Sequence, residues 1–253
     1  MTPDAPEVLL ATGVAETRRG HWLKAAPIFQ QLDASYARYG MAHRAWNPHG
    51  IFLMYVGRVR EAVPALERGR AEDPLDPEIA LYQGLASTVA GNFAAALAEI
   101  DRGLELEGFD TTLRTAGVLI ALNKHDRVEI DKRLSALSDS DPFTHLHRGL
   151  ARFMDAPDGA AAEIRHRASE ANPVEKTLLA FWAAFYHDPA LSLELWSQGT
   201  RSTDGLSQPL MSDVRKLPAF RDVVRELGLV DYWRAYGWSD YCRPLAGENF
   251  VCS

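Results

Sequence analysis

Glycine recurs in pairs along the first hundred residues of this chain, and the spacing of these pairs constrains the fold more than any other feature. The second glycine follows the first by seven residues in three copies: Gly13 and Gly20, Gly50 and Gly57, Gly84 and Gly91. An alanine follows each second glycine five residues later: Ala25, Ala62 and Ala96. The first two copies lie 37 residues apart and the next two 34 apart. A repeat of this length predicts a stack of similar units, each of which buries an apolar face against the next.

Each mark of the repeat has a physical role in a pair of antiparallel helices. The first glycine lies in the middle of a helix, where the missing side chain lets the paired helix approach closely. The second glycine ends that helix, because a left-handed cap residue is least strained as glycine. The alanine faces the partner helix, and Leu66 or Ile100 four residues later fills the space between the two helices. Pro74 then stops the second helix. Each unit is therefore predicted to be a helical hairpin.

The repeat weakens after the third copy but keeps its register. Gly117 and Gly149 continue the mid-helix glycine at spacings of 33 and 32 residues. At the turn, His125 stands where glycine is expected, and Gly159 restores the glycine. A sixth hairpin follows, in which Pro189 opens the second helix.

The composition divides the chain into three parts. Residues 6–200 carry the repeats and are predicted to form an all-α fold, a right-handed superhelix of five to six helical hairpins. Residues 201–213 belong to a stretch rich in Gly, Ser, Thr and Asp, and are expected to form a surface linker. Residues 214–253 end in a dense group of aromatic side chains. We expect this group to cap the apolar end of the last hairpin, and an aromatic ligand site is the alternative.

The array resembles tetratricopeptide repeats over about residues 6–200, most strongly in the second and third copies. The residues that carry the resemblance are Trp46, Gly50, Gly57, Ala62 and Pro74. The segment from Arg215 to Arg243 is similar to the end of the repeat regions in bacterial winged-helix regulators and adenylate-cyclase signalling proteins. These resemblances imply a free-standing sensor-like or adaptor-like module of bacterial signalling. Such a module would be a non-catalytic scaffold that binds a partner in the concave groove lined by the first helix of each hairpin.

The register of the repeat locates the residues expected to line that groove and to contact a partner: Asn47, Ile51, Met54, Leu81, Leu85, Arg114, Leu150 and Phe153. Most of them are apolar, so the expected partner is a protein or peptide with an apolar segment rather than an acidic peptide terminus. Three alternatives stay open. These side chains pack against neighbouring helices, the groove is filled by the chain's own aromatic tail, or it mediates self-association.

The sequence holds no pattern typical of catalysis. A phosphate-binding glycine loop, a dinucleotide-binding GxGxxG turn, a GxSxG elbow and an HExxH pair are all absent from it. His145 and His147 lie two residues apart, which on a helix turns them to nearly opposite faces, so they are not expected to share a metal. We therefore expect no enzyme activity, no cofactor and no metal site. The alternative is a helical-repeat protein that binds or processes a small molecule in its concavity.

Charge and hydropathy limit the partners and the location. The net charge of −7 argues against a nucleic-acid partner, which needs a concentrated basic face. No apolar run approaches the length that spans a bilayer, and the start carries no signal-peptide pattern, so the protein is expected to be cytoplasmic without membrane contact. Cys242 and Cys252 lie ten residues apart in the tail. Cytosolic thiols stay reduced, which favours two free thiols, and a disulfide that pins the tail is the alternative.

Overall fold

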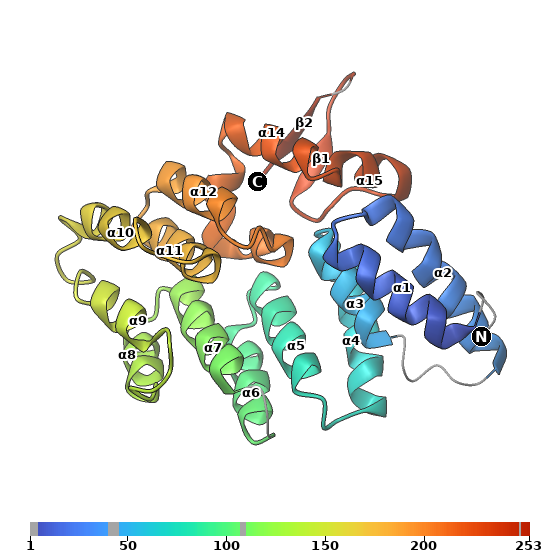
Figure 1. The fold of residues 1–253 in the computed structure, drawn as a ribbon, viewed down its shortest axis with the longest axis horizontal. Helices are drawn as coiled ribbons and strands as arrows, with labels where there is room; N and C mark the ends of the chain where they lie inside the picture. Colours follow the sequence, from blue (N-terminus) through green and yellow to red (C-terminus); the bar gives the residue numbers. More distant parts are fainter. Residues whose placement is uncertain (1–4, 40–45, 107–109, 248) are drawn as a thin grey trace.

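The protein is described by a computed structural model that covers residues 5–39, 46–106, 110–247 and 249–253. Within these residues twelve helices pack as six successive antiparallel pairs. The pairs are α1 (Pro6–Arg18) with α2 (Trp22–Tyr39), α3 (Trp46–Tyr55) with α4 (Val59–Glu72), α5 (Pro77–Val89) with α6 (Phe93–Leu104), α7 (Asp110–Lys124) with α8 (Arg127–Ser135), α9 (Thr144–Ala151) with α10 (Ala160–Ala168), and α11 (Pro173–Phe185) with α12 (Pro189–Gln198). The all-α helical-repeat fold is confirmed, and the pairs follow one another along an arc (Figure 1).

The turns inside the hairpins confirm the role assigned to the second glycine. Gly57 and Gly91 have φ angles of 76° and 74°, in the left-handed region that glycine adopts without strain. His125, 34 residues after Gly91, has the same left-handed backbone with φ 53°, and His187 in the last hairpin has φ 59°. The two imidazole rings stack at a centroid distance of 6.0 Å. The turn geometry therefore persists where the sequence no longer shows glycine.

The mid-helix glycines lie where the paired helices approach most closely. A Cβ atom on Gly50 would lie 2.8 Å from the side chain of Leu66, and one on Gly84 would lie 3.0 Å from that of Ile100. These partners are the predicted seam residues. A side chain in place of glycine would therefore push the two helices of the hairpin apart.

Residues 201–213 do not form a surface linker. They fold into the short helices η2 (Thr203–Ser207) and η3 (Pro209–Met211) and the start of α13 (Ser212–Arg215), and we call them the inner segment. The inner segment contacts α3, α7 and α11, the first helices of three hairpins. Its Leu206 and Met211 side chains are completely buried. The polar composition misled the prediction, because the Thr203 and Gln208 side chains bond to backbone carbonyls of the repeats instead of water.

The C-terminal part closes the arc by returning to the first hairpins. It consists of α14 (Pro218–Glu226), α15 (Leu229–Tyr236) and the antiparallel strands β1 (Cys242–Pro244) and β2 (Phe250–Cys252). Figure 1 shows α15 beside α2. The Trp233 indole donates a hydrogen bond to the Val56 carbonyl at 2.8 Å, and the Trp22 indole donates one to the Leu227 carbonyl at 2.7 Å. The aromatic residues were expected to cover the last hairpin, whereas Tyr232 and Trp233 contact Phe52 and Val56 of the second hairpin.

The two cysteines form a disulfide. Cys242 and Cys252 face each other across the β1–β2 pair, with their Cα atoms 4.0 Å apart. The expectation of two free thiols is therefore wrong. The hairpin decides this, because it places two residues ten positions apart directly opposite each other, a proximity that spacing along the chain does not reveal.

Removing this disulfide is expected to destabilise the protein by about 2–3 kcal/mol, because the bond restricts the conformations that the unfolded chain can adopt. The double variant Cys242→Ser/Cys252→Ser should unfold at a correspondingly lower urea concentration, measured by circular dichroism. Dithiothreitol should lower the midpoint of the wild-type protein and leave that of the double variant unchanged. An equal response of the two proteins to the reductant would contradict the bond.

Candidate functional site

The residues predicted to line the concave groove have different surroundings in the structure. Met54 and Leu150 are completely buried, so a partner cannot reach them in this conformation. Ile51, Leu81 and Leu85 are half-buried and pack against the core. Phe153 lies beyond the end of α9, beside the turn residue Gly159, and is half-buried.

The two polar residues of the predicted groove are held by bonds within the chain. Asn47 donates a hydrogen bond from its side-chain nitrogen to Asp76 at 2.9 Å. Arg114 donates to the Ala136 carbonyl at 3.1 Å and lies 3.8 Å from the carboxylate of Asp110. Asn47 therefore connects the second hairpin to the start of the third, whereas Arg114 bonds within the fourth hairpin.

The chain's own inner segment fills the middle of the concave face. Gln208 donates a hydrogen bond to the Leu85 carbonyl, and the Thr203 hydroxyl donates one to the Tyr55 carbonyl at 2.6 Å. These contacts come from residues 203–211 and not from the aromatic tail. Thus, of the alternatives left open by the sequence, the structure shows a groove filled by another part of the same chain.

A hollow of about 660 Å³ lies beside the inner segment, between α4 and α5. Its apolar wall consists of Val59 and Val63 on α4 and of Ala86, Val89 and Ala90 on α5. The spacings of four residues on α4 and of three and four on α5 place each set on one helix face. We call this hollow the seam groove. Short side chains on both helices leave the space that forms it.

The seam groove continues along the same two helices. A second hollow of about 240 Å³ lies between α4, α5 and α6 and shares Val63 and Ala86 with the first. Its other lining residues are mostly polar and include Arg70 and Glu99, which form an ion pair. The two hollows together offer an elongated surface with an apolar centre.

One end of the seam groove holds the buried cation Arg215. Its side chain is 7% exposed and donates to the backbone oxygens of Leu206, Gln208 and Ser253. These bonds use Nε and Nη1, and Nη2 has no partner among the described residues. Burial lowers the pKa of the guanidinium to about 10, so the side chain stays charged at neutral pH. A charged nitrogen is therefore available to a ligand in the groove.

Arg133 is a second buried arginine, and carboxylate side chains balance its charge. Its side chain is 8% exposed, almost as buried as that of Arg215. It forms a bidentate pair with Asp101 and a further bond of 2.7 Å with Glu129. Although burial by itself acts to lower it, the pKa of Arg133 is raised overall by these carboxylate bonds. No carboxylate side chain bonds to Arg215 in the part of the chain that the structure describes, so its charge is the less compensated of the two.

Two residues near Arg215 in the groove, Asp240 and Tyr241, do not balance its charge with a carboxylate bond. Asp240 accepts a hydrogen bond from the backbone N–H of Arg60 at 2.8 Å, and its carboxylate lies 3.8 Å from the Arg60 guanidinium. The Tyr241 ring lies 5.2 Å below the Arg215 guanidinium, a cation–π distance. The Tyr241 hydroxyl is buried without a hydrogen-bond partner, and burial raises its pKa. The groove thus ends in donors that the protein leaves unpaired.

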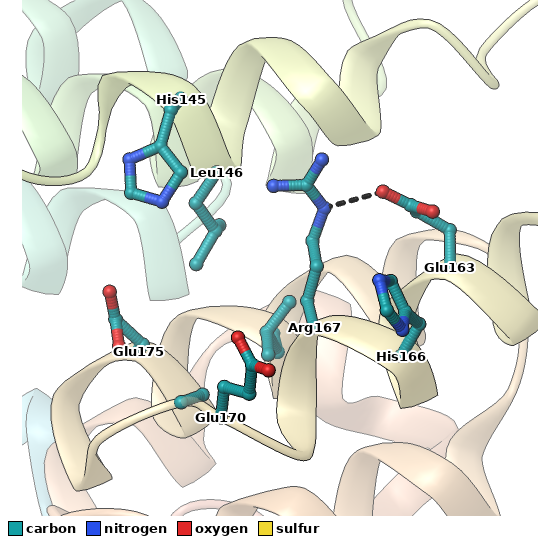
Figure 2. Close-up of a pocket in the computed structure, with 9 residues that line it drawn as sticks. His145, Leu146, Glu163, His166, Arg167, Glu170 and Glu175 are labelled. Carbon is teal, nitrogen blue, oxygen red and sulfur yellow. Dashed lines mark hydrogen bonds and ion pairs between the residues drawn. The ribbon is translucent and has the colours of Figure 1, made fainter.

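A different hollow of about 390 Å³ lies between α9, α10 and α11 (Figure 2). Figure 2 shows Arg167 bonded to Glu163, at 2.7 Å, with Glu170 and Glu175 on the opposite side. His145 lines this hollow, whereas His147 on the same helix is completely buried. No group of three or more His, Cys, Asp or Glu side chains in the described residues could hold a metal ion. The mixed charges, with the arginine already paired, give this hollow no preference for one ligand class.

The apolar wall of the seam groove lies inside a segment that matches a known repeat family. Residues 49–110 match the tetratricopeptide repeat family, and this range contains the whole apolar wall of the groove. Tetratricopeptide repeats generally mediate protein–protein interaction. A search of curated proteins finds no match to the chain. In the described ranges, no helix combines the length and hydrophobicity that crossing a membrane requires.

Sequence reasoning missed the seam groove because its two walls come from distant parts of the chain. The apolar wall lies at residues 59–90, whereas the polar end is formed by Arg215, Asp240 and Tyr241. The available signal was the run of short side chains at Val59, Val63 and Ala86. That signal alone does not show what closes the groove.

Proposed function

We propose that this protein is a non-catalytic interaction module, and that a protein partner lays an apolar segment in the seam groove. The observation that carries this proposal is a groove whose apolar wall lies within the tetratricopeptide repeat sequence and whose end holds an unpaired cation. A partner segment with an acidic side chain next to apolar ones would match both features. The similarity of Arg215–Arg243 to repeat regions of bacterial signalling proteins supports a role as a sensor or adaptor in such a system.

The concave groove is a less favourable site for the partner than the seam groove. The inner segment lies in it with Leu206 and Met211 completely buried, and Leu210 donates its backbone N–H to Asn123 at 2.9 Å. A partner that displaced these residues would have to expose their side chains and break these bonds first. The seam groove needs no such rearrangement. The concave-groove residues named from the sequence therefore serve mainly to hold the inner segment.

The proposal is tested with a charge placed on the apolar wall. Val63 is half-buried between α4 and α5, so Val63→Glu adds a carboxylate to the groove without entering the core. Val128→Glu is the matched control, because Val128 is 79% exposed on α8. A partner is first captured from a lysate of the native host with the wild-type protein, then purified, and its affinity for each variant is measured by calorimetry.

The expected result is a loss of affinity of about tenfold or more for Val63→Glu, since a carboxylate in the groove costs its desolvation and repels an acidic segment. Val128→Glu should bind like the wild-type protein. Thermal unfolding of both variants checks that the fold is retained. Unchanged affinity of Val63→Glu, or an equal loss in both variants, would place the partner elsewhere and overturn the proposal.

A further inference from the structure

A small hollow of about 140 Å³ lies on the concave face and is lined by α5, α7, α11 and the inner segment. We call it the inner hollow. Leu85, Leu119, Leu178 and Phe181 form its apolar wall, each from one of the three surrounding helices. An apolar cavity of about 150 Å³ holds a molecule the size of benzene. The inner hollow therefore has room for a compact organic ligand.

Asn123 and Thr177, which line the inner hollow, both donate hydrogen bonds within the chain. Asn123 donates to the Leu119 carbonyl at 2.9 Å, and its oxygen accepts the backbone N–H of Leu210. The hydroxyl of Thr177 donates to the Pro173 carbonyl at 3.1 Å. The Thr177 hydroxyl thus has no donor left for a ligand, and Asn123 has one amide N–H and its oxygen committed within the chain.

Gln208 presents an acceptor without a partner. Its side chain is 2% exposed, and its nitrogen donates to the Leu85 carbonyl at 3.4 Å. Its oxygen, Oε1, is buried with no hydrogen-bond partner among the described residues. Rotating the amide would set Oε1 against the Leu85 carbonyl, an unfavourable contact of two acceptors, so the assignment stands. A buried amide oxygen without a donor costs free energy that a donor in the hollow would recover.

Asp204 presents a carboxylate without a cation. It accepts a hydrogen bond from the Ser202 hydroxyl at 2.5 Å, and no basic side chain pairs with it in the described residues. The closest basic residue in sequence, Arg201, bonds to Glu226 at 2.9 Å instead. Burial raises the pKa of the Asp204 carboxyl, as expected of an acid whose charge is not compensated.

The charge of Asp204 also affects the pKa of two tyrosines on the concave face, Tyr55 and Tyr82. The Tyr82 hydroxyl donates to the Tyr55 hydroxyl at 3.3 Å. The negative charge of Asp204 is the main cause that raises the pKa of Tyr55, and it adds to the effect of burial on Tyr82. Both phenols therefore stay protonated, and neither supplies a positive charge to balance Asp204.

We infer that the inner hollow binds a small protonated amine with a compact apolar body. The ammonium group would donate to the Asp204 carboxylate and to Gln208 Oε1, and the body would lie against Leu85, Leu178 and Phe181. A buried amide oxygen without a donor selects a ligand that donates a hydrogen bond, and a carboxylate without a cation selects a positive charge. An anion or a neutral acceptor is disfavoured for the same reasons. This site is separate from the seam groove and does not depend on the proposed partner.

The inference is tested by thermal unfolding of the full chain with a series of ammonium ions from methylammonium to benzylammonium. At least one member should raise the Tm by about 3 °C at about ten times its dissociation constant. Benzyl alcohol, a neutral molecule of nearly the same shape as benzylammonium, and sodium chloride at equal ionic strength should not. Direct titration by calorimetry then gives the affinity of the best ligand.

The variant Asp204→Asn removes the charge and keeps an oxygen that accepts from Ser202, so the fold should be retained. The ligand-induced shift should disappear in this variant and persist in Asp213→Asn, whose carboxylate is exposed and pairs with Lys216. No shift with any member of the series would overturn the inference. So would an equal response to benzyl alcohol, or a shift that survives Asp204→Asn.

Discussion

Replacing Gly57 with alanine is expected to destabilise the protein by about 3 kcal/mol, because two costs combine at this turn. The φ angle of 76° lies in the left-handed region, where a Cβ atom is strained. An added Cβ would also lie 2.6 Å from Tyr241 and 2.9 Å from Ser239, both in the returning C-terminal part. Alanine would therefore strain the turn and push away the segment that closes the arc. Urea unfolding followed by circular dichroism measures the loss.

Gly91 is the matched control, because it holds the same turn position 34 residues later. Its φ angle is 74°, and an added Cβ would meet no atom within 4 Å. Gly91→Ala should cost only the backbone strain, about 1 kcal/mol. The difference between the two variants then measures the contact of the C-terminal part with the second hairpin. Equal losses in the two variants would show that this contact adds nothing to stability.

Acidification from pH 7 to pH 4 is expected to cost the protein about 3 kcal/mol through a single buried histidine. His147 is completely buried and accepts a hydrogen bond on Nδ1 from the Trp182 indole at 3.0 Å. Its neutral form therefore carries the proton on Nε2, which has no partner. Burial, and then the nearby His145, lowers the pKa of His147 from 6.5 to about 4.

The sign of the effect follows from the direction of this shift. Above pH 6.5 the histidine is neutral in both the folded and the unfolded chain, and its contribution to stability is complete. Between pH 6.5 and about 4 the unfolded chain binds the proton more tightly, so the free energy of unfolding falls with pH. Below the folded-state pKa both states are charged and the loss is complete.

The variant His147→Gln keeps an acceptor for the Trp182 indole and removes the titrating group. Its free energy of unfolding, measured by urea denaturation at each pH, should lack the part of the acid loss that His147 causes. His166→Gln, at an exposed position of α10, controls for the chemical change from histidine to glutamine. The explanation fails if wild-type protein and His147→Gln lose the same stability between pH 7 and pH 4.

The hairpins could be predicted because their determinants are local. The glycine at the turn and the glycine at the helix crossing, such as Gly57 and Gly50, act through residues of the same hairpin. Gly50 meets Leu66, sixteen residues away, and this separation repeats with the hairpin. Periodicity along the chain reports such contacts directly. The turn geometry is kept even where glycine is replaced, because His125 adopts the left-handed backbone that its position requires.

The candidate sites could not be predicted because they depend on contacts that do not repeat. Trp22 bonds to the Leu227 carbonyl across 205 residues, and Trp233 bonds to the Val56 carbonyl across 177. Each occurs once in the chain, so no period marks it. The unpaired nitrogen of Arg215 and the unpaired oxygen of Gln208 are visible only after every neighbouring partner has been placed.

The sequence by itself therefore determined the helical hairpins, their turns and their all-α stacking, since these follow from glycine, alanine and proline at fixed distances within one unit. Only the tertiary structure decided that residues 201–213 lie in the concave face and that the C-terminal part closes on the first two hairpins. It also decided that Cys242 and Cys252 are joined. The physical reason is that local periodicity fixes how each unit folds, whereas closure depends on which buried surfaces and hydrogen-bond partners meet once the whole array has curved.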